Sequence, residues 1–186
     1  MTASINKYRA HRLSVRDLSL IALVTAMTAV MAQISIPMPG GVPLTLQTLA
    51  VSLAGILLGA KRGTVSMLVY LLLGAVGVPV FAGFTGGATI LFGSTGGFLL
   101  SFPLMAFVIG CGAPYLTTRK ARYILFLVLG TALNYVCGML LFSLLTGSGL
   151  GQAFTACVLP FLPTTIIKAI VATMIGSRVR RGVGNL

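Results

Sequence analysis

Six long apolar segments dominate this chain, and each is close to the about 20 residues that a helix needs to cross roughly 30 Å of hydrocarbon. Hydrophobic residues make up 57% of the sequence and charged residues only 8%, which is the composition of an integral membrane protein. We therefore expect an all-α fold, a bundle of six transmembrane helices. The expected spans are residues 18–36, 44–60, 64–81, 98–116, 123–145 and 153–176.

Basic and uncharged connections alternate between these segments. All but one of the 13 Lys and Arg residues fall in four clusters, within residues 7–16, 61–62, 119–122 and 178–181. The other connections contain no charged residue: 36–43, 82–97 and 146–152. Because Lys and Arg are enriched in cytoplasmic connections, the alternation predicts that both termini are cytoplasmic.

This topology divides the chain into a basic cytoplasmic tail, residues 1–17, and a single six-helix membrane domain, residues 18–186. We expect a multi-pass protein of the cell membrane. The pI near 10.7 would fit nucleic-acid binding, but the positions of the charges assign the excess to topology, so no nucleic-acid partner is expected.

The remaining cation, Lys168, lies in the middle of the last apolar segment. A lysine there costs roughly 2.5–3.5 kcal/mol on insertion scales, so such a residue is a candidate functional group. The only acidic residue of the chain, Asp17, precedes the first span, which leaves Lys168 without an encoded counter-charge. We interpret Lys168 as the receptor for an anionic ligand; the alternative is a lysine that extends to water or stays neutral.

Six glycines occur within residues 83–97, mixed with hydroxyl and aromatic side chains and no charge. Glycine lets the main chain approach a ligand closely, so this stretch is a candidate binding loop; the alternative is an external loop. Neutral polar residues in or beside the spans are candidates for ligand contact or for hydrogen bonding between helices. They are Gln33, Thr45, Gln47, Asn134 and Tyr135.

Enzymatic function is not expected, because no span clearly supplies an acid or histidine for acid–base work. Cys111, Cys137 and Cys157 show no metal-ligand spacing, so neither a metal site nor a cofactor is expected. A phosphate-binding loop with Gly-Lys-Ser/Thr is also absent, so active transport requires a partner.

Several motifs resemble the BioY family, the biotin-binding S-components of energy-coupling-factor (ECF) transporters. They are PLTLQTLA at 43–50, GAKRG at 59–63, YLLLGAVGVPVF at 70–81, GSTGGF at 93–98, and PFLP at 160–163 followed by Lys168. The resemblance covers nearly the whole chain. It implies a six-helix receptor that binds biotin from outside and works with an ECF transmembrane coupling protein and ABC-type ATPases, surrounded by membrane lipid.

In this interpretation Lys168 pairs with the biotin carboxylate, and neutral groups hold the ureido ring. The further candidate biotin-binding residues are Thr165, Asn134, Tyr135, Thr45, Gln47, Thr85, Gly86, Gly87, Ser94, Thr95, Gly96, Gly97 and Phe98. The resemblance also assigns partner docking to the small-residue face of the first span at Ala22 and Ala26, for which the sequence alone allows packing within the bundle equally well. The alternatives are a receptor for another small carboxylate vitamin and a self-sufficient secondary transporter.

Two positions depart from the family pattern. This chain has Thr164 and Thr165 where the family usually has Gly-Asp, and Ser94 where the family usually has Pro. Without the acid, Lys168 lacks a carboxylate one turn before it. Thr165 still lies on the same helical face and can donate or accept a hydrogen bond.

Overall fold

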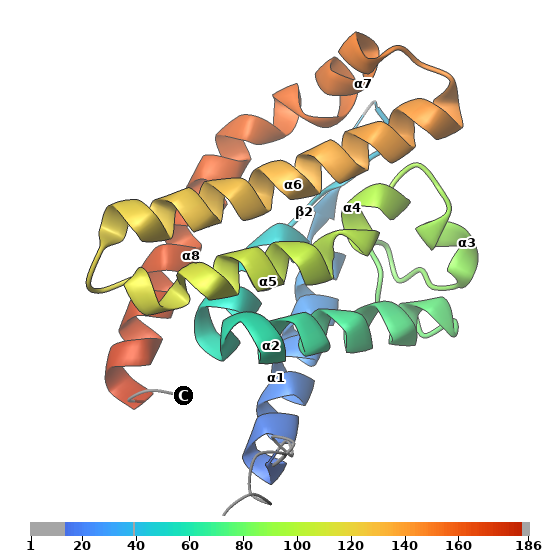
Figure 1. The fold of residues 1–186 in the computed structure, drawn as a ribbon. Coiled ribbons are helices and arrows are strands. Elements are labelled where there is room, and N and C mark those ends of the chain that lie inside the picture. The colour runs from blue at the N-terminus through green and yellow to red at the C-terminus, as the bar shows by residue number, and fades with distance from the viewer. Residues whose placement is uncertain (1–13, 39, 184–186) are drawn as a thin grey trace, which may run out of the picture.

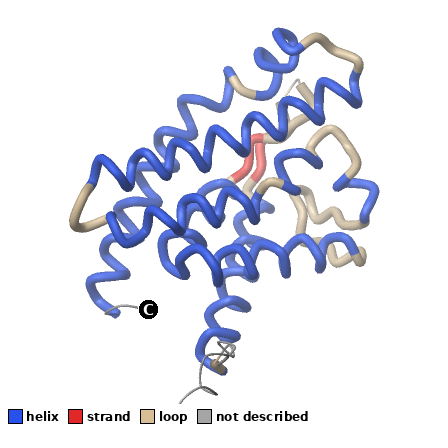
Figure 2. Tube along the Cα trace, viewed as in Figure 1, coloured by secondary structure: helices blue, strands red, loops and turns tan. Residues whose placement is uncertain are grey.

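The computed structural model describes residues 14–38 and 40–183, and these ranges are mainly helical (Figure 2). Within them, β1 (Ser35–Ile36) and β2 (Leu44–Thr45) form a two-stranded antiparallel ribbon, in which Ser35 lies opposite Thr45. The α-helices are α1 (Val15–Gln33), α2 (Gln47–Ala75), α3 (Ala88–Leu91), α4 (Gly96–Leu100), α5 (Phe102–Gly112), α6 (Lys120–Thr146), α7 (Leu150–Cys157) and α8 (Leu162–Val183).

Helix α1 begins at Val15, earlier than the expected residue 18. The backbone N–H of Asp17 donates to the Ser14 hydroxyl (3.1 Å) and the Ser14 N–H donates to the Asp17 carboxylate (3.0 Å), a capping box. Asp17 Oδ1 also lies 2.9 Å from Arg62 Nη1, which joins the start of α1 to α2. The rest of the expected tail, residues 1–13, lies outside the described residues.

The turn expected at Lys61 and Arg62 is wrong in position. Both residues are helical within α2, and the break in this helix lies at Gly59. Gly59 has φ 74° and ψ −177°, which only glycine adopts readily. The two arms fold back on each other: a Cβ atom on Gly63 would lie 2.9 Å from the Ala54 carbonyl oxygen, whereas in a straight helix these residues are about 13 Å apart. The arms correspond to the second and third expected segments, and the second arm ends at Ala75.

The glycine-rich segment after α2 is folded against the bundle. Phe81 is buried over Gly74, where a Cβ atom would lie 2.0 Å from the ring, and it pairs with Thr85 in an antiparallel bridge. The rest of the segment forms α3 and α4, which lie beside the start of α5 (Figure 1). This segment therefore closes one end of the bundle.

The expected span at 153–176 is wrong in one respect, because two helices occupy it. Helix α7 ends at Cys157, a short 3-10 helix covers Leu159–Phe161, and α8 then begins at Leu162. Pro160 lies in this turn, and proline both lacks a backbone donor and clashes with the preceding helical turn. Helix α8 continues past residue 176 through the last basic cluster.

Helices α2 and α5 pack with their backbones in close contact. A Cβ atom on Gly55 would lie 2.8 Å from the Ala106 carbonyl oxygen, and one on Gly110 would lie 2.4 Å from the Ala60 backbone nitrogen. Small residues allow this close approach, which is a common means of association for membrane helices. The large core side chains, including Tyr70 and Ile109, fill the space around this contact.

Five helical segments of the described chain are long and apolar enough to cross a membrane, with α2 counted as one. Large apolar side chains are exposed along α1, α6 and α8, as expected for helices that face lipid. The start of α1 and the end of α8 lie at the same end of the molecule (Figure 1). The number of spans and the cytoplasmic location of the termini stay predictions.

Candidate functional site

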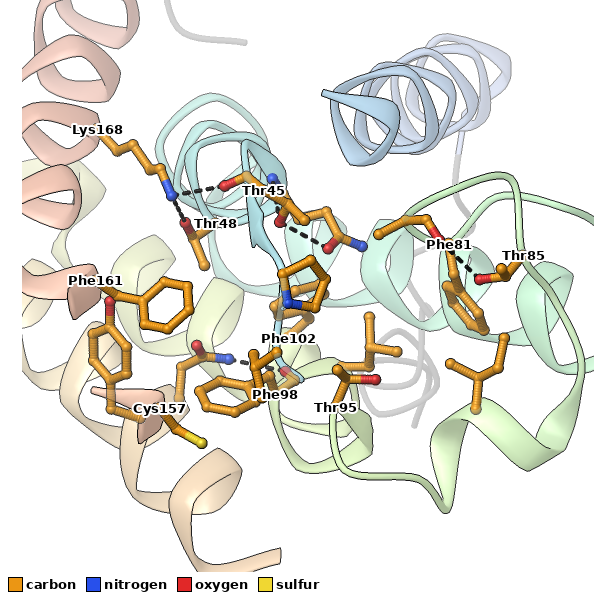
Figure 3. Close-up of a pocket in the computed structure, with 18 residues that line it drawn as sticks. Thr45, Thr48, Phe81, Thr85, Thr95, Phe98, Phe102, Cys157, Phe161 and Lys168 are labelled. Carbon is orange, nitrogen blue, oxygen red and sulfur yellow. Dashed lines mark hydrogen bonds between the residues drawn. The ribbon is translucent and has the colours of Figure 1, made fainter. Parts of the chain in front are cut away.

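A cavity of about 290 Å³ lies among the start of α2, the glycine-rich segment, α6 and α8. This volume is at the lower end of the range for small-molecule sites, about 300–1,000 Å³. Of the residues that the sequence singled out, those lining the cavity are Thr45, Gln47, Thr85, Thr95, Phe98, Asn134, Tyr135 and Lys168. The cavity thus brings together residues from four distant parts of the sequence (Figure 3).

Lys168 extends from α8 toward the ribbon and the start of α2 at one end of the cavity (Figure 3). Its Nζ donates to the Thr45 carbonyl oxygen (2.7 Å) and, at 3.4 Å, to the Thr48 hydroxyl. Both acceptors are neutral, and an ammonium has a third N–H to donate. The acidic residue Asp17 pairs instead with Arg62. The electrostatic environment at this end of the cavity therefore favours an anion.

A chain of hydrogen bonds fixes the cavity wall beside this lysine. The Thr45 hydroxyl donates to Gln47 Oε1 (2.9 Å), Gln47 Nε2 donates to the Tyr70 hydroxyl (2.7 Å), and that hydroxyl donates to the Val80 carbonyl (2.9 Å). Gln47 is only 6% exposed. These bonds tie the ribbon to the segment that follows α2, and they set the position of the carbonyl that Lys168 contacts.

Asn134 is buried on α6 and presents a hydrogen-bond acceptor. Its Nδ2 donates both to the Phe98 carbonyl (2.9 Å) and to the Ser101 hydroxyl (2.7 Å), which uses the two amide hydrogens. The amide oxygen is therefore what Asn134 can offer to a ligand. The Phe98 ring meets the Tyr135 ring edge-on at 6.3 Å, so aromatic surface lies next to this acceptor.

Thr165 does not line the cavity but contacts a residue that does. Its hydroxyl is hydrogen-bonded to the Tyr135 hydroxyl, which joins α8 to α6 one turn before Lys168. At the position where the BioY pattern has an acid, this chain therefore has a group that holds the Tyr135 ring. Direct contact of Thr165 with a ligand stays a prediction.

Within the glycine-rich segment, Thr85 and Thr95 line the cavity, whereas the other singled-out residues do not; they are Gly86, Gly87, Ser94, Gly96 and Gly97. A Cβ atom on Gly97 would lie 2.5 Å from the Cys137 carbonyl oxygen, so Gly97 allows close packing against α6. Ligand contact by these five residues stays a prediction.

Sequence reasoning missed ten lining residues: Val42, Pro43, Thr48, Phe81, Ala82, Ile90, Leu99, Phe102, Cys157 and Phe161. Pro43, Thr48, Phe81 and Phe161 belong to the motifs recognised in the sequence, so these motifs were the available signal. The others are apolar residues of the spans and of the uncharged connections, and nothing in the sequence distinguishes them from core residues.

Ala22 and Ala26 are exposed on α1, next to exposed Leu23 and Val30. Ala32, further along the same helix, is fully buried. Ala22 and Ala26 therefore lie on an outward face of α1 and are not part of the packing inside the bundle.

Three comparisons with known proteins agree with one another. The model of the BioY family matches residues 4–185. The chain is 42% identical over 165 residues to "Probable biotin transporter BioY" of Pyrococcus horikoshii, covering 89% of this chain and 96% of that protein. It is 39% identical over 169 residues to "Biotin transporter BioY" of Thermotoga maritima, covering 89% and 96%.

A solved structure has a closely similar fold. The crystal structure of the S-component for biotin from an ECF-type ABC transporter superposes with a TM-score of 0.82 at 30% identity, covering 90% of this chain and 92% of that one. These relatives are transporter components and not enzymes.

Proposed function

Because the chain belongs to the BioY family, we propose that it is the biotin-binding membrane subunit, the S-component, of an ECF transporter. The relatives named as biotin transporters and the solved biotin S-component support this assignment. The observation that best supports an anionic ligand is the position of Lys168 at one end of a small, partly aromatic cavity. The hydrogen-bond partners of Lys168 within the protein are neutral.

The biotin carboxylate pairs with the Lys168 ammonium, using the N–H that Thr45 and Thr48 leave free or displacing the weaker 3.4 Å contact. The ureido N–H groups donate to the Asn134 amide oxygen and to the Thr85 hydroxyl oxygen, whose own hydrogen is donated to the Ala82 carbonyl (2.9 Å), and the Thr95 hydroxyl donates to the ureido oxygen. A desolvated ion pair of this kind contributes strongly to affinity because each charge compensates the burial of the other.

Uptake requires partners in this proposal. The exposed face of α1 at Ala22 and Ala26 docks on an ECF transmembrane coupling protein, whose ABC-type ATPases supply the energy. Small side chains at these two positions let a partner helix approach closely. Six spans in the cell membrane with both termini in the cytoplasm complete the proposal.

The test is equilibrium binding to the purified full-length protein in detergent by isothermal titration calorimetry. Biotin, pantothenate and nicotinate are titrated separately, because all three are small carboxylate vitamins. We expect saturable binding of biotin with one site per chain and none of the other two in the same concentration range. If another carboxylate binds and biotin does not, the assignment of biotin as the ligand is wrong. If none of the three binds, the receptor function is overturned.

A further inference from the structure

A second, larger cavity of about 1,000 Å³ opens along the outer side of the bundle between α6 and α8. Its walls are mainly apolar. The large apolar side chains that line its middle are Ile124, Leu127, Val128, Ile166, Ile170 and Met174. Five of these six are more than half exposed, and only Leu127 is buried, so the groove faces the surroundings of the bundle. In a membrane bundle such exposed apolar side chains face lipid, and here they line a hollow in which a lipid chain can lie.

Two hydroxyl pairs bridge α6 and α8 along this groove. The hydroxyls of Tyr123 and Thr173 lie 2.9 Å apart, and those of Tyr135 and Thr165 are also hydrogen-bonded. All four residues line the groove, and each pair satisfies its own hydroxyls. The polar groups along the groove therefore do not need a polar ligand, and what the groove offers along its length is apolar contact.

Cations mark one end of the groove. Lys120, the first residue of α6, and Arg181, in the last turn of α8, both line it and are both exposed. From Lys120 to Tyr135 the groove follows α6 for about 22 Å at 1.5 Å per residue, which exceeds the about 15 Å of hydrocarbon in one leaflet. An apolar groove that is longer than one leaflet is thick and ends in two cations complements a molecule with acyl chains and an anionic head.

We propose that the α6–α8 groove is a binding site for an anionic phospholipid, with the headgroup on Lys120 and Arg181 and an acyl chain along the groove toward Tyr135. Two basic clusters contribute these cations, and by the positive-inside rule they lie on the cytoplasmic side, where anionic lipids are enriched. A second copy of the chain is disfavoured as occupant, because its own basic clusters would meet the same cationic end. The site is separate from the biotin cavity, with Tyr135 in the wall between the two.

The test is native mass spectrometry of the purified full-length protein titrated with phosphatidylglycerol or phosphatidylcholine. The test variant carries Lys120→Gln and Arg181→Gln. The matched control carries Arg119→Gln and Arg178→Gln, which removes the same charge from the same two helix ends outside the groove lining. We expect phosphatidylglycerol to bind the test variant about 30-fold more weakly, as follows from about 1 kcal/mol per cation, and the control like wild type.

A second pair of variants tests the apolar part independently of charge. Ala132→Phe fills the groove, whereas Leu133→Phe changes the neighbouring exposed position outside the lining. We expect only Ala132→Phe to lower phosphatidylglycerol retention. The proposal is overturned if both charge variants lose lipid equally, if phosphatidylcholine binds wild type as well as phosphatidylglycerol does, or if the protein forms a dimer that Ala132→Phe abolishes.

Discussion

At Gln47 the side-chain amide is engaged on both sides by the protein. It accepts from the Thr45 hydroxyl and donates to the Tyr70 hydroxyl, and it is nearly inaccessible to solvent. We therefore assign Gln47 mainly to holding the ribbon in the position where Lys168 contacts it. Buried hydrogen-bond chains of this kind fix one arrangement, because each unpaired member would be costly.

Gln47→Leu tests this assignment. The substitution leaves the half-buried Thr45 hydroxyl without its acceptor and the buried Tyr70 hydroxyl without its donor, and an unpaired buried polar group costs about 1–3 kcal/mol. We expect the variant to unfold at a lower temperature in detergent, measured by thermal denaturation. The control Gln152→Leu, at an exposed position of α7, is expected to unfold like wild type. Equal stability of both variants would contradict the network.

Among single residues, Lys168 could be singled out from the sequence, because a charge in an apolar segment without an acidic partner is visible without a structure. It was also sufficient for Thr45, Asn134 and Tyr135 as cavity-lining residues. The engagement of Gln47 with Tyr70 and of Thr165 with Tyr135 was not predictable, because each pair depends on how separate helices pack.

Among the elements, α2 has the most unusual backbone, since its reversal depends on Gly59. Gly59→Ala places a side chain in a conformation that is strained for every residue except glycine, at a cost of about 1–3 kcal/mol. We predict a lower thermal stability in detergent. Gly151→Ala is the control, because it lies in α7 with open space around it and gains helix propensity. A Gly59→Ala variant as stable as Gly151→Ala would contradict the described reversal.

The exposed alanines of α1 give a prediction about partner docking. Ala22→Leu with Ala26→Leu adds bulk on the outward face, so it holds a partner helix away without disturbing the cavity. We expect biotin affinity by calorimetry to stay within about twofold of wild type, while ATP-driven uptake into vesicles reconstituted with the partner subunits is lost. Equal loss of binding and uptake would assign these residues to the bundle itself.

Most of the helices were predictable from their apolar length, whereas one break within them was placed wrongly and another was missed. The reversal of α2 was expected at Lys61 and Arg62 because charges mark the ends of spans, but the backbone turns at Gly59 and the charges follow two and three residues later. The break before α8 was missed because the residues around it, from Ala156 to Leu162, are apolar and look like part of one continuous span. Pro160 was the available signal for this break.

At the scale of the whole molecule, contacts bring described parts of the basic clusters together, and one of them is the bond from Arg180 to the Ala113 carbonyl, near the cluster at 119–122. Arg62, in the cluster at 61–62, pairs with Asp17, which directly follows the N-terminal cluster, and the described end of α8 lies at the same end as the start of α1 (Figure 1). This arrangement agrees with both termini on one side, while the cavity is lined by the ribbon and the glycine-rich segment, which follow the far ends of α1 and α2. The asymmetry suits a receptor that takes its ligand from outside.

Cysteine labelling tests the topology directly. In a background that lacks Cys111, Cys137 and Cys157, a cysteine at position 120 is predicted to react with an impermeant maleimide only after the cells are opened. A cysteine at position 148, in the opposite connection, is predicted to react in intact cells. Rapid labelling at position 120 from outside would contradict cytoplasmic termini with six spans.

The central claim is that Lys168 receives the carboxylate of biotin, and calorimetry with a pair of ligands tests it most directly. Biotin and biotin methyl ester are titrated into wild type, Lys168→Ala and the control Lys61→Ala, which changes a lysine outside the cavity. Removing one partner of a buried charge pair costs about 2 kcal/mol or more, so biotin affinity should fall at least about 30-fold in Lys168→Ala alone. The account predicts that wild type and Lys61→Ala prefer biotin over its ester and that Lys168→Ala loses this preference. Unchanged biotin affinity in Lys168→Ala, or an undiminished preference for the acid, would contradict it.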